Sequence, residues 1–337
     1  MSQVTPEQAI QIALQHHRQG QLQQAETIYR QVLQQQPNNH DAMQLLGALA
    51  YQVGQMTAAA ELIGKAIAIA PGKVHYHANL GMVLMKSGRE REAEAALRRA
   101  IAIDAGHVEA HIHLGHLFMD EGKWTQSAEH FRTALRLKPD AAAVHNNLGH
   151  VLHSMGHAEQ AAGAYADAIR CRPDFGEAHA NLGGLLLEAG QVAEGLENMR
   201  KAIALQPNFP AVHGNLLYAL HFDASMSPEA IFEEHLNWSR RNAEPLKGEI
   251  RPHANNRDPN RRLKIGYVSQ DFRDHPVGRF ILPILAAHDR GQVEVHVFSD
   301  VFFQDDLTAL MRQHGDHWHN VHSKTDAAVA NLVRELA

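Results

Sequence analysis

The sequence predicts an α-solenoid followed by the beginning of a parallel α/β lobe. Leu-Gly pairs recur every 34 residues through the first two hundred residues. After residue 262 the hydrophobic pattern changes, and short alternating strands are followed by amphipathic helices. The chain has 337 residues, 45% hydrophobic and 20% charged, which is ordinary for a globular protein large enough for two domains.

The 34-residue period is marked by glycines at fixed positions. Leu-Gly pairs stand at 46–47, 80–81, 114–115, 148–149 and 182–183, and Ala13 holds the glycine position one period earlier. Seven residues after each of these six positions stands another glycine: Gly20, Gly54, Gly88, Gly122, Gly156 and Gly190. The first glycine allows close helix packing, and the second ends the first helix at a tight turn. Helix-turn-helix units of 34 residues are typical of tetratricopeptide repeats. Residues 6–222 are therefore predicted to form six repeats and the first helix of a seventh.

A proline closes five of the six repeats. It stands 24 residues after the first glycine position, at Pro37, Pro71, Pro139, Pro173 and Pro207, and Ala105 takes its place in the third repeat. Because proline disfavours a helical residue before it, the second helix of each repeat is predicted to end there.

A histidine recurs along the first helices of the repeats. It stands four residues before the glycine of the Leu-Gly pair, at His77, His111, His145 and His179, and His213 continues the series. Stacked repeats lie about 10 Å apart, too far for neighbouring histidines to share a metal ion. We therefore expect these side chains to pack between helices and to form local hydrogen bonds.

An asparagine recurs two residues before the same glycine. The series is Leu45, Asn79, His113, Asn147 and Asn181, with Asn215 in the seventh first helix. This face lines the inside of a superhelix, and helix propensity does not explain asparagine there. An amide donates and accepts hydrogen bonds at once. We predict that Asn79, Asn147, Asn181 and Asn215 bind an extended acceptor peptide; the alternative is bonding between neighbouring repeats.

Residues 223–262 are predicted to be a helical junction and linker. Ser227, Pro228 and Glu229 resemble a helix start. The apolar stripe of this helix, with Ile231 and Trp238, is expected to dock on the following domain. Residues 245–262 contain three prolines and few apolar residues, so they are predicted to be a connecting loop.

Residues 263–337 alternate between strand and helix patterns. Strands are predicted at 262–270, 293–300 and, shorter, at 317–321, with helices beginning near Pro276 and covering 305–315 and 325–337. This order predicts a parallel, Rossmann-like sheet. Ligands of such sheets bind beyond the carboxyl ends of the strands. The segment "SQDFRDHPVG", residues 269–278, lies at that end of the first strand.

His275 is the candidate catalytic residue of this segment. It stands beside Asp271 and Asp274 at the start of a predicted helix, where a histidine is suited to be a general base or an anion contact. The alternative is that it caps the helix. Neither a dinucleotide-binding G-x-G-x-x-G nor a G-x-x-x-x-G-K-[ST] phosphate loop occurs in the sequence.

Taken together, "VHNNLG" (144–149), "AHANLG" (178–183) and "LKIGYVSQDFRDHPVG" (263–278) resemble the protein O-GlcNAc transferase family, glycosyltransferase family 41, SPINDLY-like proteins included. The resemblance implies that the array feeds acceptors to a two-lobed GT-B glycosyltransferase, with His275 in the cleft. It implies transfer of N-acetylglucosamine from UDP-GlcNAc to Ser or Thr of proteins, without a metal ion or other cofactor. The alternatives are a non-catalytic peptide-binding scaffold and a protein O-fucosyltransferase.

The sequence ends at Ala337, inside a predicted helix. The resemblance implies that most nucleotide-sugar contacts lie in a second lobe. We therefore expect the chain to be truncated within the first catalytic lobe, to contain no nucleotide-binding residues and to be inactive alone. A nucleotide sugar would bind only if that lobe is present.

Several other partners and locations are not expected. A net charge of −6 gives no basic surface for nucleic acid, and no apolar run approaches the roughly 20 residues of a membrane span. One cysteine, Cys171, and a start without signal-peptide features favour a cytoplasmic protein. A cluster of histidines has spacing that suits zinc, but we favour solvent-facing residues of a short strand, whose side chains alternate between faces. They are His314, His317, His319 and His322.

Overall fold

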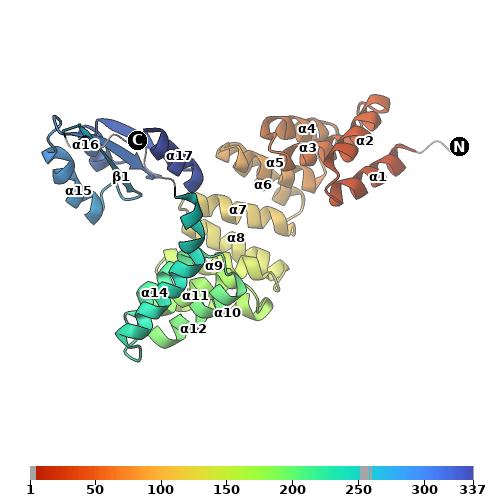
Figure 1. Cartoon of the computed structure of the whole chain (residues 1–337). Coiled ribbons are helices and arrows are strands. Elements are labelled where there is room, and N and C mark those ends of the chain that lie inside the picture. Colours follow the sequence, from red (N-terminus) through yellow and green to blue (C-terminus); the bar gives the residue numbers. More distant parts are fainter. Residues whose placement is uncertain (1–4, 251–257, 259, 337) are drawn as a thin grey trace. The chain divides into compact units, whose positions relative to one another are not determined.

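A computed structural model describes residues 5–250, 258 and 260–336 of the chain. It contains two compact units, Met1–Pro245 and Leu246–Ala337 (Figure 1). The first unit is helical and the second contains a small parallel sheet. The predicted fold class, a solenoid followed by an α/β unit, is confirmed.

The first unit consists of consecutive antiparallel helix pairs. The pairs are α1 (Pro6–Arg18) with α2 (Leu22–Gln35), α3 (His40–Gln52) with α4 (Met56–Ile69), α5 (Val74–Lys86) with α6 (Glu90–Ile103), α7 (Val108–Asp120) with α8 (Trp124–Leu137), α9 (Ala142–Ser154) with α10 (Ala158–Cys171), and α11 (Gly176–Glu188) with α12 (Val192–Leu205). The helix α13 (Pro210–Leu220) follows, as predicted for a seventh first helix. Each hydrophobic core cluster lies within or between successive pairs, which is the packing expected of a repeat array.

The two glycine positions of each repeat have the predicted roles. A Cβ on the glycine of each Leu-Gly pair would lie 2.5–2.9 Å from a side chain of the partner helix, as between Gly115 and the Phe131 ring. The six turn glycines have φ between +69° and +81°, a conformation that other residues rarely adopt. Glycine is therefore needed at both positions for steric reasons.

The second helix of each repeat ends two residues before the predicted proline position. The helix α6 ends at Ile103 in the same way, although Ala105 replaces proline there. The helix end is therefore set by the repeat packing, and proline reinforces it.

The helix α14 (Pro228–Asn242) begins as predicted, with the Ser227 hydroxyl accepting a hydrogen bond from the backbone of Ala230 at 3.2 Å. Ile231 packs against the cluster formed by α12 and α13. At this residue the helix packs on the repeat array, and docking of the stripe on the following domain stays a prediction. The predicted loop 245–262 begins inside the 3-10 helix η1 (Glu244–Glu249), and residues 251–257 and 259 lie outside the described part.

The second unit is a three-stranded parallel sheet in the order β1-β2-β3. Its elements are β1 (Leu263–Ser269), α15 (Pro276–Ala287), β2 (Val293–Ser299), α16 (Asp306–Arg312), β3 (His317–Asn320) and α17 (Asp326–Leu336). Val295 and Val297 on one face of β2 pack with Leu285 of α15 and Met311 of α16. Glu294, His296 and Phe298 alternate with these residues and so lie on the opposite face.

Among the described residues, no helix combines the length and apolar character needed to cross a membrane.

Candidate functional site

The loop after β1 lies at the carboxyl end of the sheet, as predicted. Ser269 is the last residue of β1 and pairs in register with Ser299, the last residue of β2. The Ser269 hydroxyl accepts a hydrogen bond from the backbone of Asp271 at 2.9 Å and so turns the chain away from the strand. The loop therefore begins where ligands of parallel sheets bind.

Contacts with α16 hold this loop in place. The carbonyl of Phe272, whose side chain is buried, accepts a hydrogen bond from the Thr308 hydroxyl at 2.7 Å. The backbone N–H of Asp274 donates to the Asp305 carboxylate at 2.6 Å. This bond, together with the bonds from Thr308, lowers the pKa of Asp305. The loop is thus bonded to a second element rather than free in solvent.

Gly278 explains how α15 starts so close to the loop. A Cβ at this residue would lie 2.1 Å from the carbonyl oxygen of Arg273 and 3.0 Å from that of Asp271. Any larger side chain would collide with backbone atoms, which cannot move aside without opening the loop. The glycine of "HPVG" is therefore required by close approach.

His275 is the N-cap residue of α15. Its Nδ1 accepts a hydrogen bond from the backbone of Val277 at 3.3 Å, so the capping alternative holds. Its side chain is 39% exposed, and Nδ1 lies 3.8 Å from the carboxylate of Asp271. A neutral imidazole that accepts at Nδ1 carries its proton on Nε2. In this arrangement His275 offers a donor, and it becomes a base at Nε2 only if the proton moves to Nδ1.

A hollow of about 390 Å³ lies at the same edge of the sheet. It is lined by Gln270, Arg273, Asp300, Phe302, Phe303 and His322. Asp300 and His322 are joined at 3.1 Å, and the side chains of Phe302 and Phe303 are 88% and 74% exposed. The residues that follow β2 were not predicted to be part of a site. Their position directly after a predicted strand, at the end where ligands bind, was the feature that could have indicated them.

The structure places the four asparagines at equivalent positions of α5, α9, α11 and α13. The Asn147 amide is 2.7 Å from Nε2 of His116, and Asn181 donates to the Asn146 side chain at 3.0 Å. Both contacts join neighbouring repeats, which was the alternative explanation. Asn79 is half-buried and Asn215 is exposed. Peptide binding by these residues stays a prediction, since the interhelical bonds each use only part of an amide.

The histidine series forms local hydrogen bonds, as expected. Nε2 lies 2.9–3.2 Å from the carbonyl oxygen of the residue six positions earlier in four members: His77, His111, His145 and His179. His213 differs, because its buried Nδ1 has no hydrogen-bond partner among the described residues. Four members of the series are therefore explained by packing.

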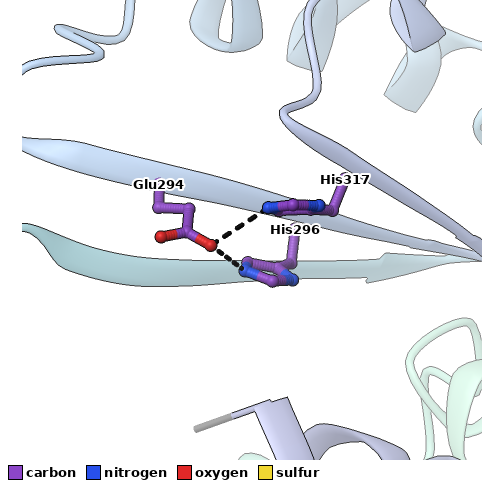
Figure 2. Close-up of side chains that lie close together, drawn as sticks. All are labelled: Glu294, His296 and His317. Carbon is purple, nitrogen blue, oxygen red and sulfur yellow. Dashed lines mark hydrogen bonds and ion pairs between the residues drawn. The ribbon is translucent and has the colours of Figure 1, made fainter.

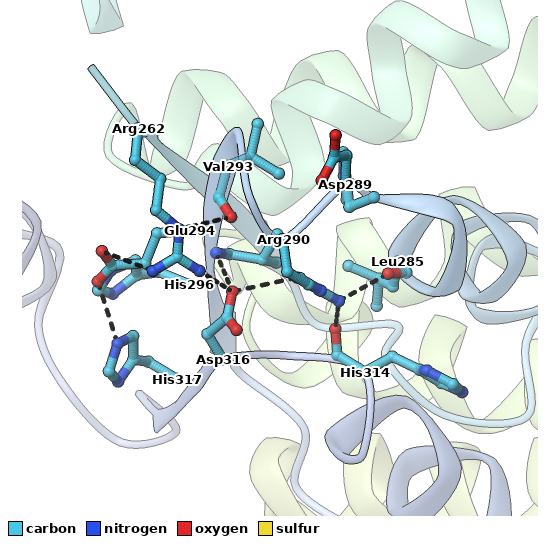
Figure 3. Close-up of polar contacts among 12 residues, drawn as sticks. Arg262, Leu285, Asp289, Arg290, Val293, Glu294, His296, His314, Asp316 and His317 are labelled. Atoms are coloured by element: carbon cyan, nitrogen blue, oxygen red, sulfur yellow. Dashed lines mark hydrogen bonds and ion pairs between the residues drawn. The ribbon is translucent and has the colours of Figure 1, made fainter. Parts of the chain in front are cut away.

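The four histidines with zinc-like spacing do not form one cluster. His317 joins Glu294 and His296, with its Nε2 3.1 Å from Oε1 of Glu294 (Figure 2). The His314 ring points away from this group (Figure 3). His322 bonds to Asp300 at the carboxyl edge. The parallel register brings His296 beside His317, and the sequence spacing gave no sign of it.

Charged residues join the amino-terminal ends of β2 and β3 (Figure 3). Asp316 accepts a hydrogen bond from the backbone of Val295 at 2.7 Å and lies 3.2 Å from Arg290. This bond, with the nearby Arg290 and Arg262, holds the pKa of Asp316 below its usual value. Arg290 also donates to the carbonyls of Leu285 and His314. The network fixes this edge of the sheet.

Comparison with known proteins identifies both parts of the chain. Tetratricopeptide-repeat models match residues 16–83, 50–112, 115–156 and 146–210. The model described as glycosyl transferase family 41 matches residues 199–324, which include His275 and the whole loop before α15. The resemblance to this family is confirmed.

Curated relatives include SPINDLY proteins of plants, named "Probable UDP-N-acetylglucosamine--peptide N-acetylglucosaminyltransferase SPINDLY". The proteins of Petunia hybrida and Arabidopsis thaliana are each 31% identical over 123 residues, which is 35% of this chain. The match spans only 13% of the length of each plant protein.

Among solved structures, an O-GlcNAc transferase mutant of Thermobaculum terrenum is 35% identical, with a TM-score of 0.59. The match covers 69% of this chain and 44% of that chain. Pseudomonas aeruginosa pilF is 19% identical, with a TM-score of 0.57 over 62% of this chain and 96% of that one. The second likeness shows the fold alone.

Proposed function

We propose that this chain belongs to a cytoplasmic protein O-linked N-acetylglucosaminyltransferase, in which the repeat array binds the acceptor and the α/β unit contributes to the transfer site. The observation that carries the proposal is the family 41 match over residues 199–324. It includes a loop that is held in place at the carboxyl edge of the sheet and ends at His275. The structural likeness to the Thermobaculum terrenum transferase supports it.

The proposed reaction transfers N-acetylglucosamine from UDP-GlcNAc to a Ser or Thr hydroxyl. The hydroxyl oxygen forms a bond to the anomeric carbon, the bond from that carbon to the diphosphate breaks, and UDP leaves with the electron pair. The hydroxyl proton must pass to a base. A metal ion is not required in this scheme.

His275 is the proposed base or positioning group. Its Nδ1 lies 3.8 Å from the Asp271 carboxylate. If that distance shortened when an acceptor bound, Asp271 would hold the proton on Nδ1 and leave Nε2 free to accept one. A carboxylate that fixes the tautomer of a catalytic histidine is an established arrangement. Asp271 is then a positioning residue, which acts through His275.

Two other functions stay open as alternatives. The array alone is also suited to a non-catalytic scaffold for peptides, and the pilF likeness shows that such a fold occurs in very different proteins. The second alternative is protein O-fucosylation. It stays open because fucosyl relatives share the architecture that the resemblance implies. The identity of the transferred sugar distinguishes the two transferases from each other. Transfer of either sugar distinguishes both of them from the scaffold.

The test is a transfer assay with the full-length protein that contains this chain. A library of Ser- and Thr-containing peptides is incubated with UDP-GlcNAc or with a nucleotide-fucose donor, and the products are analysed by mass spectrometry. The proposal expects addition of one N-acetylhexosamine from UDP-GlcNAc. Addition of fucose instead would favour the fucosyltransferase, and peptide binding without transfer from either donor would favour the scaffold.

A further inference from the structure

We propose that Glu294, His296 and His317 form a binding site for Zn²⁺ or a similar divalent transition-metal ion. The site lies on the sheet face opposite the core of α15 and α16. It is distinct from the loop that ends at His275. The three side chains converge on one point in Figure 2.

The ligand atoms are already close enough for one ion. Nε2 of His296 lies 3.0 Å from Oε1 of Glu294, and Nε2 of His317 lies 3.1 Å from the same oxygen. All three atoms lie within 4.8 Å of one another. Zinc bonds to histidine nitrogen and carboxylate oxygen are about 2.0–2.2 Å long, so the ligand atoms of a tetrahedral ion are roughly 3.3 Å apart. Small side-chain rotations would therefore complete the site.

The backbone sets this arrangement independently of any ion. Glu294 and His296 are two residues apart on β2, so both side chains point to the same face. His296 pairs in register with His317 of the parallel strand β3. Their rings stack with centroids 4.5 Å apart. Strand pairing thus supplies two imidazoles and a carboxylate without a flexible loop.

Neighbouring residues orient the ligands as in known metal sites. His296 is 7% exposed, and its other ring nitrogen, Nδ1, lies 3.2 Å from Nε2 of His319. Without an ion, Nε2 of His296 donates to Oε1 of Glu294. A metal-bound histidine usually donates from its second nitrogen to a neighbouring acceptor. On binding of an ion, the proton of His296 would therefore move to Nδ1, which faces Nε2 of His319.

Polar contacts hold the carboxylate of Glu294 in place. Nε2 of His296 and Nε2 of His317 both lie within hydrogen-bond distance of its Oε1. Arg262 lies 3.7 Å from Oε2 of Glu294 and donates to the carbonyl of Val293 at 3.1 Å. It therefore engages the oxygen that does not face the histidines. This contact leaves Oε1 directed at the proposed site.

The donor set selects the kind of ion. Two imidazoles and one carboxylate suit Zn²⁺ and related transition metals, whereas Mg²⁺ and Ca²⁺ prefer oxygen ligands only. Three protein ligands leave a coordination position for water. Without an ion, the two Nε2–H groups donate to Oε1. Binding moves these protons to Nδ1 of each ring, and affinity is expected to fall as the pH is lowered because protons compete with the ion for the imidazole nitrogens.

The position of the site indicates what the ion would do. Glu294 is the second residue of β2, and Ser299 at the carboxyl edge lies five residues further on, about 16 Å along a parallel strand. An ion there would not meet a substrate at the His275 loop. It would join β2 to the four-residue strand β3. We infer a stabilising ion of the α/β unit.

Zinc titration of the full chain tests this inference. The protein is treated with chelator, dialysed and titrated with ZnCl₂ in a calorimeter at pH 7.5, and Co²⁺ absorption spectra report the ligand set. The variants are His317→Ala, at a half-exposed side chain, and Glu294→Gln, which keeps the shape of the carboxylate. The control is His314→Ala, a histidine of the same segment whose ring points away from the cluster.

The expected result is one tight site in the original chain and in His314→Ala, unaffected by excess Mg²⁺. Zinc should also raise the melting temperature of the α/β unit in these two proteins. His317→Ala and Glu294→Gln should each weaken this site by at least about tenfold. The chain has 26 histidines and will bind further zinc weakly, so the comparison between variants is decisive. Equal zinc binding and equal stabilisation by zinc in all four proteins would overturn the proposal, and so would the loss of the tight site in His314→Ala alone.

Discussion

At the scale of single residues, His275 has a structural property and a proposed chemical one, which use different tautomers of its ring. Nδ1 caps α15 by accepting a hydrogen bond from the backbone of Val277. The proposed reaction needs the proton on Nδ1 and a free Nε2. Asparagine is among the best N-cap residues, whereas alanine is among the poorest. The two substitutions therefore distinguish the structural property of His275 from its proposed chemistry.

We predict that His275→Ala lowers the unfolding free energy of the α/β unit by about 1 kcal/mol, because the cap is lost. His275→Asn should remain within a few tenths of a kcal/mol of the original protein. Chemical denaturation followed by circular dichroism measures both values. Equal destabilisation by the two variants would show that the histidine ring, rather than its cap, is needed for folding.

A second residue-scale prediction concerns protonation of the repeat array. His130 is partly buried between His111 and Phe118, 3.0 Å from the first and stacked on the second. Burial, with nearby His111 and Arg98, lowers its pKa to about 4, against 6.5 in the unfolded chain. Between these values the unfolded chain binds the proton more readily. The contribution of His130 to stability is therefore complete above pH 6.5 and is lost as the pH falls towards 4.

We accordingly expect His130→Gln to reduce the loss of stability between pH 7 and pH 5. Urea unfolding of the original and variant proteins at both pH values gives the two differences. Other histidines titrate in the same range, so only the change caused by the substitution is informative. An unchanged pH dependence would mean that His130 is not neutral in the folded array.

The residue scale also shows what the sequence could not reveal. His275 could be placed from "QDFRDHPVG" because a loop between a strand and a helix is a local feature. The cluster of Glu294, His296 and His317 could not, because strand register is not written in any local pattern. The spacing of His314, His317, His319 and His322 suggested a different group. His317 and His319 lie on the same face of β3, where both rings stack on His296, so the expected alternation does not separate them. His314 and His322 lie outside this strand.

At the scale of elements, the repeat period predicted helices and their ends closely. The fixed spacing of the glycines predicted the close helix contact and the turn in each repeat. Both features require glycine for steric reasons that depend on neighbouring residues. The packing of α14 was harder to predict. An apolar stripe shows that a helix packs against something but not against what, and Ile231 packs on α12 and α13.

Two adjacent glycines of α11 test the steric explanation. A Cβ at Gly183 would lie 2.9 Å from Met199 and 3.0 Å from the carbonyl oxygen of Gly195, whereas one at Gly184 would meet nothing within 4 Å. Gly183→Ala should therefore lower stability by about 1–3 kcal/mol through overpacking. Gly184→Ala should raise it by about 0.5–1 kcal/mol through helix propensity.

Thermal and urea unfolding of the two alanine variants gives the comparison. Both substitutions add one methyl group to the same helix, so each serves as the control for the other. Similar effects of the same sign would contradict the requirement for glycine at the helix contact.

At the scale of the whole molecule, the proposed function combines an acceptor-binding array with a transfer unit. We predict that replacing Asn147, Asn181 and Asn215 together by alanine weakens binding of an acceptor peptide by at least about tenfold, since each lost hydrogen bond contributes about 0.5–1.5 kcal/mol. Fluorescence anisotropy with a labelled peptide identified in the transfer assay measures the effect.

Asn38→Ala, in the turn between α2 and α3, is the matched control and should leave the affinity unchanged. The bonds of Asn147 and Asn181 to neighbouring repeats require that the melting temperature of the triple variant is measured alongside. A triple variant that is less stable but binds peptide normally would assign these asparagines to the array's own packing.

The most direct test of the central claim is the rate of N-acetylglucosamine transfer by the full-length protein carrying His275→Asn. This variant keeps the cap of α15, so a loss of activity cannot be attributed to unfolding of the loop. The account predicts that the original protein transfers the sugar from UDP-GlcNAc and that the variant loses at least about 100-fold in kcat/KM, the lower end of what a general base contributes. Normal turnover by His275→Asn would contradict the placement of the transfer site at this loop.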